Sequence, residues 1–483
     1  MARLDLTPAI AACHRHVRWP LGLALLSLVA MHVAGGFDTV RDFFEGGNSM
    51  VVERGGWARP EWLTGLPYTL TPYAPGYFTA VALLNSAVAA VTNVEAWPTP
   101  VVSGRLLSVA AGLVTSAMAA VAVARRIGAV EPGLVAAAVF LSYSGVSFWI
   151  NLFRVDALAT AFAIATYAAA SGSAGLVVSG LLVVAGSLVK QTTILAAAPV
   201  ALHLAFTGRL GSAARYLAGV GLAAAAIWAV VFVASGGYYF DISIVGNRRD
   251  YSVTQAIAMT ADFTRKRWTL LAGVALVCAW LIQSSPLRRC QYVVALLVAS
   301  VIAAAFSGIE GASTNFFLEP SALAAIVIGM YGVGPLWRAS PQRTALVLWA
   351  TSAVLIVWAG SAAAGSIRRD RPPLDLSAFR AELPHTSVFV DWRFLAAARQ
   401  AGLRPMLNDP FFLTIVVRNG AFKLDPMLED LRSGRIAGLV LFTSLFEQDD
   451  VPGWPPELVT AFRSHFETVG ELDGAYLYRF RQP

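Results

Sequence analysis

The sequence predicts a polytopic α-helical membrane protein with a small α/β domain at its carboxyl end, and two observations carry this prediction. Of the 483 residues, 57% are hydrophobic and only 13% are charged, whereas a soluble globular chain carries about 25% charged residues. Apolar stretches of about 17–25 residues, the length that a helix needs to cross a bilayer, recur over most of the chain. Most of the surface is therefore expected to meet lipid.

About eleven membrane-spanning helices are expected from these stretches. They cover residues 19–36, 101–124, 132–150, 156–171, 174–189, 192–207, 215–235, 268–285, 291–307, 319–337 and 344–365. Because many spans follow the first, we interpret that first stretch as a retained anchor and not as a cleaved signal peptide. A further apolar stretch, residues 73–93, is interpreted as an interfacial or re-entrant helix within an external loop at 36–100.

Basic residues between the stretches predict their orientation, since cytoplasmic loops are enriched in Lys and Arg. With the N-terminus inside, the cytoplasmic loops hold Arg125–Arg126, Arg209 and Arg215, Arg288–Arg289, and Arg338 with Arg343. The predicted topology is N-in and C-out, with a transmembrane domain at 1–365 and an external domain at 366–483. The same bias explains the net charge of +7, so no nucleic-acid partner is expected.

Short apolar runs predict the fold of the external domain. They are TSVFVD (386–391), AGLVLFTS (437–444) and AYLYRF (475–480), and they follow a charged, proline-bearing linker. Runs rich in β-branched and aromatic residues are typical of strands, and the lengths between them suit helices. A small α/β domain is therefore expected on the external face.

Acidic residues follow the first span in GGFDTVRDFFEGG. Asp38, Asp42 and Glu45 are spaced i, i+4 and i+7, which places them along one face of a helix. Acids in this position also fit a merely solvated interfacial segment, so the pattern alone leaves both interpretations open.

Arg154 and Asp156 interrupt the apolar stretch FWINLFRVDALATAF at residues 148–162. A simple alternative is that the two residues pair with each other, or that Asp156 is the N-cap of the next helix. That role does not explain Arg154, since a cation is unfavourable at a helix N-terminus. An anion bound between Arg154 and the helix end would explain both residues.

Further polar groups fall on the predicted external side. Lys190 stands in the apolar stretch SLVKQTTIL, from which its stem can alternatively reach the interface. Arg248 and Arg249 belong to a tyrosine-bearing loop for which a solvated turn is the alternative. The segment FSGIEGASTNFFLEPSA adds Glu310, Asn315 and Glu319.

These groups share one side of the membrane, where the positive-inside bias gives no reason for basic residues. Arg and Lys at a membrane surface suit a phosphate. Four basic residues are therefore predicted to bind the phosphate of a lipid: Arg154, Lys190, Arg248 and Arg249. Because an acid beside them suits general-base chemistry, the combination predicts an anionic lipid headgroup that reacts at the interface.

Taken in order along the whole chain, several segments resemble the GT-C superfamily of integral-membrane glycosyltransferases, in particular the group that contains protein O-mannosyltransferases and aminoarabinose transferases. They are Asp38 soon after the first span, PYTLTPYAPGYF (67–78), SGRLLSVAAGLVTSAMAAVAVARRIG (103–128), FRVDALATAF (153–162), SLVKQT (187–192) and GASTNFFLE (311–319). The resemblance implies a GT-C fold and a polyprenyl-phosphate-linked sugar as donor. A glycan, lipid or protein would be the acceptor, at the periplasmic face of the bacterial cytoplasmic membrane.

The resemblance also implies roles for single residues. Asp38 or Asp42 would be the base, or would hold a divalent metal ion, and Asp156 matches the second acid of the family. No cofactor is certain. Contacts to the acceptor or the sugar are expected from Glu45, Tyr73, Glu310, Asn315 and Glu319.

A transporter or lipid flippase is the alternative from another functional class. Such proteins are expected to show inverted repeats with paired broken helices near the bilayer midplane. The sequence shows neither pattern, and its charges gather on one side instead of at mid-depth.

Overall fold

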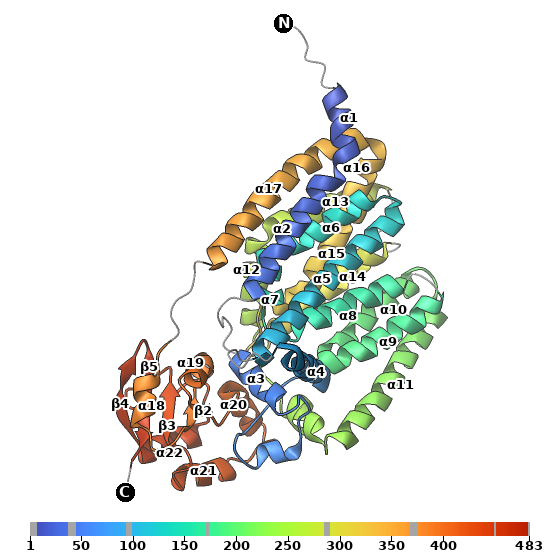
Figure 1. Cartoon of the computed structure of the whole chain (residues 1–483). Helices are drawn as coiled ribbons and strands as arrows, with labels where there is room; N and C mark the ends of the chain where they lie inside the picture. Colours follow the sequence, from blue (N-terminus) through green and yellow to red (C-terminus); the bar gives the residue numbers. More distant parts are fainter. Residues whose placement is uncertain are drawn as a thin grey trace. The chain divides into compact units, whose positions relative to one another are not determined.

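The structure, a computed structural model, describes residues 7–36, 45–92, 99–170, 173–284, 290–367, 374–448 and 451–481 (Figure 1). The chain divides into two compact units. The first contains the described residues of 1–38, 105–225 and 250–369, and the second contains those of 39–104, 226–249 and 370–483.

Helices make up the first unit in the part of the chain that the structure describes. Their bounds are α1 Thr7–His16, α2 Arg18–Gly36, α5 Thr99–Ile127, α6 Val130–Ser142, α7 Ser144–Ile150, α8 Asp156–Ala169, α9 Ser173–Val189, η2 Gln191–Ala196, α10 Ala197–Phe206, α11 Leu210–Ala234, α12 Val253–Lys266, α13 Trp268–Ser284, α14 Gln291–Phe306, η5 Thr314–Phe317, α15 Leu318–Val327, η6 Ile328–Val333, α16 Gly334–Ala339 and α17 Pro341–Ile367. One end of α5 and one end of α11 extend into the second unit.

Apolar helices confirm the prediction of a multi-pass membrane protein. Among the described residues, four helices are long and apolar enough to cross a membrane: Pro100–Ile127, Leu210–Ala234, Thr314–Ala339 and Pro341–Ala363. Shorter apolar helices cover Arg18–Ala34, Val130–Ser142, Asp156–Ala169, Gly175–Val189, Gln191–Phe206, Trp268–Gln283 and Gln291–Phe306. Each of these helices coincides with a predicted span. The number of spans and the N-in, C-out orientation stay predictions.

Three of the predicted spans contain breaks that the sequence did not indicate. Residues 132–150 form two helices, because the backbone of Tyr143 is extended between α6 and α7. Residues 192–207 begin with the 3₁₀ turn η2, and residues 319–337 contain the π-helical segment η6. Helix ends leave backbone groups without helical partners, so polar side chains are favoured near them.

Helices α8 and α9 pack against each other as an antiparallel pair. Their contact is close at Gly186, where a Cβ would lie 2.9 Å from Phe162 Cβ and 2.6 Å from Thr193 Cγ2. Small residues at such contacts are typical of helix packing in membranes. Because Lys190 Nζ lies 2.7 Å from Asp156 Oδ1, the end of α9 lies beside the start of α8.

The second unit combines helices with a five-stranded sheet. Its helical elements are α3 Glu45–Glu53, η1 Pro60–Leu63, α4 Pro75–Thr92, η3 Tyr239–Val245, α18 Ser377–Glu382, η7 Trp392–Phe394, α19 Leu395–Gln400, α20 Pro410–Arg418, α21 Asp425–Arg432 and α22 Pro456–His465. Its strands are β1 Ser387–Val390, β2 Arg404–Pro405, β3 Gly438–Leu441, β4 Phe466–Leu472 and β5 Ala475–Phe480. The strand order is β2-β1-β3-β5-β4, with β2, β1 and β3 parallel and β5 antiparallel to both of its neighbours.

The three predicted strand regions are confirmed as β1, β3 and β5. Their apolar side chains form a buried core that includes Val388, Val390, Val440 and Leu477. Strand β4 was missed because it lies at an edge of the sheet and is mostly half-exposed or exposed. Its sequence, FETVGEL, therefore lacks the apolar run that marks a buried strand.

Within the second unit, the segment before α4 is held by the carboxyl-terminal part of the chain. The Asn408 side chain accepts from the Leu70 N–H and donates to the Leu70 carbonyl, both at 2.7 Å. The Tyr68 hydroxyl donates to Asp430 Oδ2 at 2.8 Å, and burial together with this hydrogen bond raises the pKa of Tyr68. This part of the predicted external loop therefore has a fixed partner. The interfacial or re-entrant placement of α4 stays a prediction.

Candidate active site

A cluster of charged side chains lies where the start of α8 meets the end of α9. Helix α9 ends at Val189, and Lys190 has an extended backbone before η2 begins. Asp156 is the first residue of α8, and only 2% of its surface is exposed. Burial of a carboxylate is costly unless it is paired and hydrogen-bonded, so its partners decide what it does.

The Asp156 carboxylate has two close donors on one oxygen. Lys190 Nζ and Asn315 Nδ2 each donate to Asp156 Oδ1 at 2.7 Å. The alternative that Asp156 is the N-cap of its helix is wrong, because the cap position is Val155 and no side chain caps α8. The physical reason is that the carboxylate is engaged by Lys190, which follows α9, and by Asn315 of η5 instead of by its own backbone.

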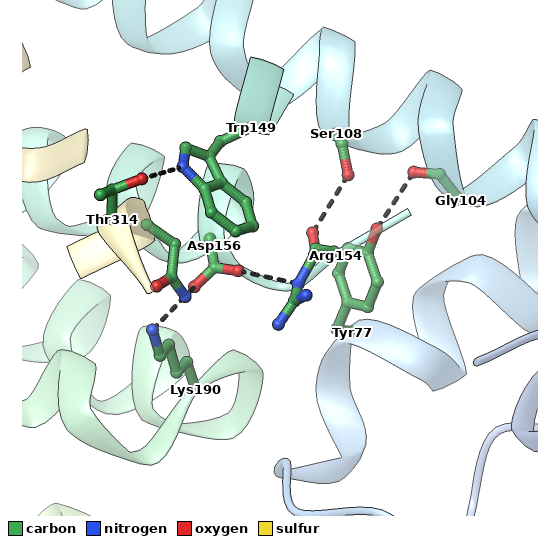
Figure 2. Close-up of polar contacts among 9 residues, drawn as sticks. Tyr77, Gly104, Ser108, Trp149, Arg154, Asp156, Lys190 and Thr314 are labelled. Carbon is green, nitrogen blue, oxygen red and sulfur yellow. Dashed lines mark hydrogen bonds and ion pairs between the residues drawn. The ribbon is translucent and has the colours of Figure 1, made fainter. Parts of the chain in front are cut away.

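Arg154 approaches the other oxygen of the same carboxylate, and Figure 2 shows Arg154 and Lys190 on opposite sides of Asp156. Arg154 Nε lies 3.6 Å from Asp156 Oδ2. The Arg154 carbonyl accepts a hydrogen bond from Ser108 Oγ on α5 at 3.1 Å. Its guanidinium carbon lies 5.2 Å from the centre of the Trp149 ring, in cation–π range.

The turn η5 supplies three consecutive residues to this cluster. Thr314 Oγ1 accepts a hydrogen bond from the indole nitrogen of Trp149 at 3.0 Å, which orients the ring near Arg154 (Figure 2). Asn315 donates to Asp156, and the Phe316 ring centre lies 4.3 Å from Lys190 Nζ. One short turn thereby positions both cations and their shared carboxylate.

A cavity of 60 Å³ opens beside the cluster. Its lining includes Asp156, Lys190, Asn315 and Glu319, and the Tyr167 hydroxyl donates a hydrogen bond to Glu319 Oε1. Asp156 Oδ2 and Asn315 Oδ1 are buried and accept no hydrogen bond from the described residues. Buried acceptors are normally satisfied, so these two atoms suit a ligand that carries hydroxyl groups.

Two cations face one carboxylate in this cluster. The side chains of Arg154 and Lys190 are only 10% and 12% exposed, and charges shielded from water interact strongly with an opposite charge. Asp156 contacts both cations, and the nearby Glu319 accepts a hydrogen bond from the Tyr167 hydroxyl. The arrangement can therefore accept an anion, and the forked guanidinium of Arg154 suits the oxygens of a phosphate.

The remaining predicted site residues are placed elsewhere or not described. Glu310 lies in the turn after α14, where its N–H donates to the Asp250 carbonyl, and it is absent from the lining of the 60 Å³ cavity. Asp38 and Asp42 lie outside the described residues. Four predicted site residues belong to the second unit: Glu45, Tyr73, Arg248 and Arg249.

Those second-unit residues have surroundings of their own. Glu45 is fully buried at the start of α3, and the Tyr73 N–H donates to Thr71 Oγ1 at 3.3 Å. Arg249 Nε donates to Asn247 Oδ1 at 2.8 Å. The Arg248 carbonyl accepts a hydrogen bond from Asn419 at 2.7 Å, which ties this basic loop to the end of α20.

A divalent metal ion was left open by the sequence. Across the described ranges, no group of three His, Cys, Asp or Glu side chains that could hold a metal ion is found. Asp38 and Asp42, the two acids that the family pattern points to, lie outside the described residues.

Sequence reasoning missed the residues that orient the cluster: Ser108, Trp149, Tyr167, Thr314 and Phe316. Aromatic residues are ordinary in apolar spans, so Trp149, Tyr167 and Phe316 carried no distinct signal. A usable signal was present at Trp149, because it lies five residues before Arg154 in a segment already singled out.

Comparison with solved structures identifies the fold. Over 95% of this chain and 97% of the other, the structure is similar to ArnT from Cupriavidus metallidurans bound to undecaprenyl phosphate, with a TM-score of 0.63 and 12% identity. The apo form of the same protein gives a TM-score of 0.60. The Archaeoglobus fulgidus oligosaccharyltransferase in complex with Zn and sulfate gives 0.51 at 11% identity, over 95% of this chain and 72% of that one. No protein-family model and no curated protein sequence matches the chain.

The fold is therefore that of the GT-C membrane glycosyltransferases, as the sequence resemblance predicted. Its structural neighbours include an aminoarabinose transferase and an oligosaccharyltransferase. At identities of 11–12%, these neighbours establish the architecture, and the reaction has to be argued from the residues of this chain.

Proposed function

We propose that this chain is a glycosyltransferase that moves a sugar from a polyprenyl-phosphate donor to an acceptor hydroxyl at the external membrane face. The observation that carries the proposal is the pairing of two poorly exposed cations with one buried carboxylate at the ends of apolar helices. The GT-C fold supports it, and so does the undecaprenyl phosphate bound by ArnT, to which this chain is similar. The orientation follows from the positive-inside prediction.

Arg154 and Lys190 would bind the donor phosphate. Both are held in place before a ligand arrives, Lys190 by Asp156 and Arg154 by the Trp149 ring. Hydrogen bonds between ionised partners are roughly twice as strong as neutral ones. Asp156 would position the two cations, and Arg248 and Arg249 remain predicted contacts to the donor phosphate.

The transfer step is a direct displacement. The acceptor hydroxyl oxygen forms a bond to the anomeric carbon while the bond from that carbon to the phosphate oxygen breaks. The lipid phosphate leaves with the bonding electron pair, and the cations stabilise the charge that develops on it. Asp38 or Asp42 would take the hydroxyl proton as general base.

The sugar and acceptor would be held by polar groups near the phosphate. Asn315 and Glu319 line the cavity beside Asp156, and the free acceptor of Asn315 suits a sugar hydroxyl. Glu45, Tyr73 and Glu310 remain proposed contacts to the sugar or the acceptor.

The direct test is a transfer assay with purified protein and a panel of polyprenyl-phosphate sugars. We expect release of the lipid phosphate and a covalent sugar–acceptor product with at least one donor. Because a general base commonly contributes about 10²- to 10⁴-fold, Asp38→Asn or Asp42→Asn should lower the rate by that factor. The matched control is Asp262→Asn, which removes a partly exposed acid paired with Arg265 and Lys266 and should leave the rate unchanged.

Two outcomes would contradict the proposal. Movement of intact lipid-linked sugar across a vesicle membrane without any covalent product would indicate a flippase. Normal turnover in both acid variants would remove Asp38 and Asp42 from the mechanism and leave the base unassigned.

A further inference from the structure

A second cavity lies at the opposite end of α8 from Asp156. Its volume is 770 Å³, and Ala168 and Ala169 at the end of α8 contribute to its lining. With a rise of about 1.5 Å per residue, twelve residues of helix separate it from Asp156 by roughly 18 Å. This cavity, the arginine cavity, belongs wholly to the first unit and is distinct from the candidate active site.

One wall of the arginine cavity is an exposed apolar stripe on α5. Val114, Ala117 and Val121 line it at helical spacing, and all three are exposed. The stripe leads directly to Arg125 and Arg126, which are exposed and line the same cavity. An apolar track that ends at two adjacent guanidinium groups matches the shape and charge of a lipid with an anionic headgroup.

Polar side chains from other helices complete the charged end. His203 on α10, together with Gln291 and Tyr292 on α14 and Tyr331 on η6, lines the cavity with the arginines. Gln291 Nε2 donates to the Tyr167 carbonyl at 2.7 Å, which ties the start of α14 to the end of α8. Several helices therefore meet here around a defined space.

We propose that the arginine cavity binds one anionic phospholipid of the adjoining leaflet. The lipid phosphate would lie at Arg125 and Arg126, and an acyl chain would follow Val114, Ala117 and Val121 along α5. Charge complementarity selects an anion, and the length of the apolar stripe selects a lipid over a small ion. The inference is independent of the proposed transferase activity.

The test is native mass spectrometry of the purified protein in neutral detergent, titrated with phosphatidylglycerol, phosphatidylcholine and inorganic phosphate. A basic residue near a lipid headgroup is worth on the order of fivefold in affinity. The variant Arg125→Gln/Arg126→Gln should therefore bind phosphatidylglycerol about ten- to thirtyfold more weakly. The control Arg15→Gln/Arg343→Gln removes two exposed arginines outside this cavity and should bind like the wild type.

A second variant separates the apolar stripe from the charge. Ala117→Trp fills the stripe on an exposed position without altering charge, and it should also weaken phosphatidylglycerol binding. Equal losses in the control and cavity variants would overturn the proposal, because only bulk charge would then matter. Competition by inorganic phosphate at the same concentration, or equal affinity for phosphatidylcholine, would overturn it as well.

Discussion

Asp156 and Asp391 are two buried carboxylates with different surroundings. They are 2% and 4% exposed. Asp156 lies in the first unit, between Lys190 and Arg154. Asp391 lies at the end of β1, where its side chain accepts from the Arg393 N–H at 3.3 Å, and burial raises its pKa to about 6 despite the nearby Arg393 charge.

The difference teaches what each carboxylate is for. At Asp391 burial favours the neutral acid, and one of its oxygens accepts the Arg393 N–H at the start of the turn η7. At Asp156 the fold brings two poorly exposed cations, Lys190 and Arg154, to one buried carboxylate. This pairing beside a cavity makes the Asp156 cluster a candidate functional site, whereas Asp391 is a structural residue.

The same substitution should act in opposite directions at the two sites. Asp156→Asn leaves Lys190 and Arg154 without their shared carboxylate, and breaking a buried charge pair costs about 3–5 kcal/mol. We expect the largest loss of thermal stability here, measured as the unfolding temperature of the purified protein at pH 7. An unfolding temperature equal to that of the wild type would mean that the ion pairs of Asp156 with Lys190 and Arg154 do not stabilise the fold.

Asp391→Asn should raise stability in a pH-dependent way. Its pKa of about 6 in the folded chain is above the ordinary 3.8, so the protonated acid is preferred in the fold. The free energy of unfolding of the wild type is highest below pH 3.8, falls as pH rises from 3.8 to about 6, and stays low above pH 6. Because the Asn variant cannot ionise, its free energy of unfolding should exceed that of the wild type by up to about 3 kcal/mol above pH 6.

The comparison is made by measuring unfolding temperatures of both proteins from pH 4 to 7.5. Other groups titrate in both, so the difference between variant and wild type is the readout. A difference that does not change with pH would contradict the raised pKa of Asp391.

The smallest expected effect concerns the hydrogen bond that orients the Trp149 ring near Arg154. Thr314→Val keeps the shape of the side chain but removes the acceptor of the Trp149 indole N–H. A neutral hydrogen bond contributes about 1 kcal/mol, so donor-phosphate affinity should fall by about fivefold or less. Ser313→Ala, at the residue before η5, is the matched control. Equal changes of affinity in both variants would contradict a role for the Trp149–Thr314 hydrogen bond in donor binding.

The sequence predicted much of this site because charges are conspicuous in an apolar chain. Arg154, Asp156, Lys190, Asn315 and Glu319 were all singled out, and the structure brings them around one cavity or its edge. Their pairing was not predictable. Lys190 is 34 residues from Asp156, and only the antiparallel packing of α8 on α9 brings the two side chains together.

The fold was predictable to a similar degree. Long apolar stretches predicted the helical membrane unit, and buried apolar runs predicted β1, β3 and β5. The break at Tyr143 and the edge strand β4 were missed, since a helix break within an apolar stretch and a half-exposed strand leave hydrophobicity almost unchanged. Tertiary contacts determine both features.

The central claim, that Arg154 and Lys190 hold the donor phosphate, is tested most directly by measuring polyprenyl-phosphate binding. Loss of a charged hydrogen bond of about 1.5–3 kcal/mol predicts ten- to hundredfold weaker binding for Lys190→Met and Arg154→Gln. The double variant Asp156→Asn/Lys190→Met removes the cation and its partner together, so no buried carboxylate is left uncompensated. If Lys190 contacts the phosphate, this variant should bind as weakly as Lys190→Met. Wild-type affinity in the double variant, or in both single variants, would contradict the claim and assign these cations to structure alone.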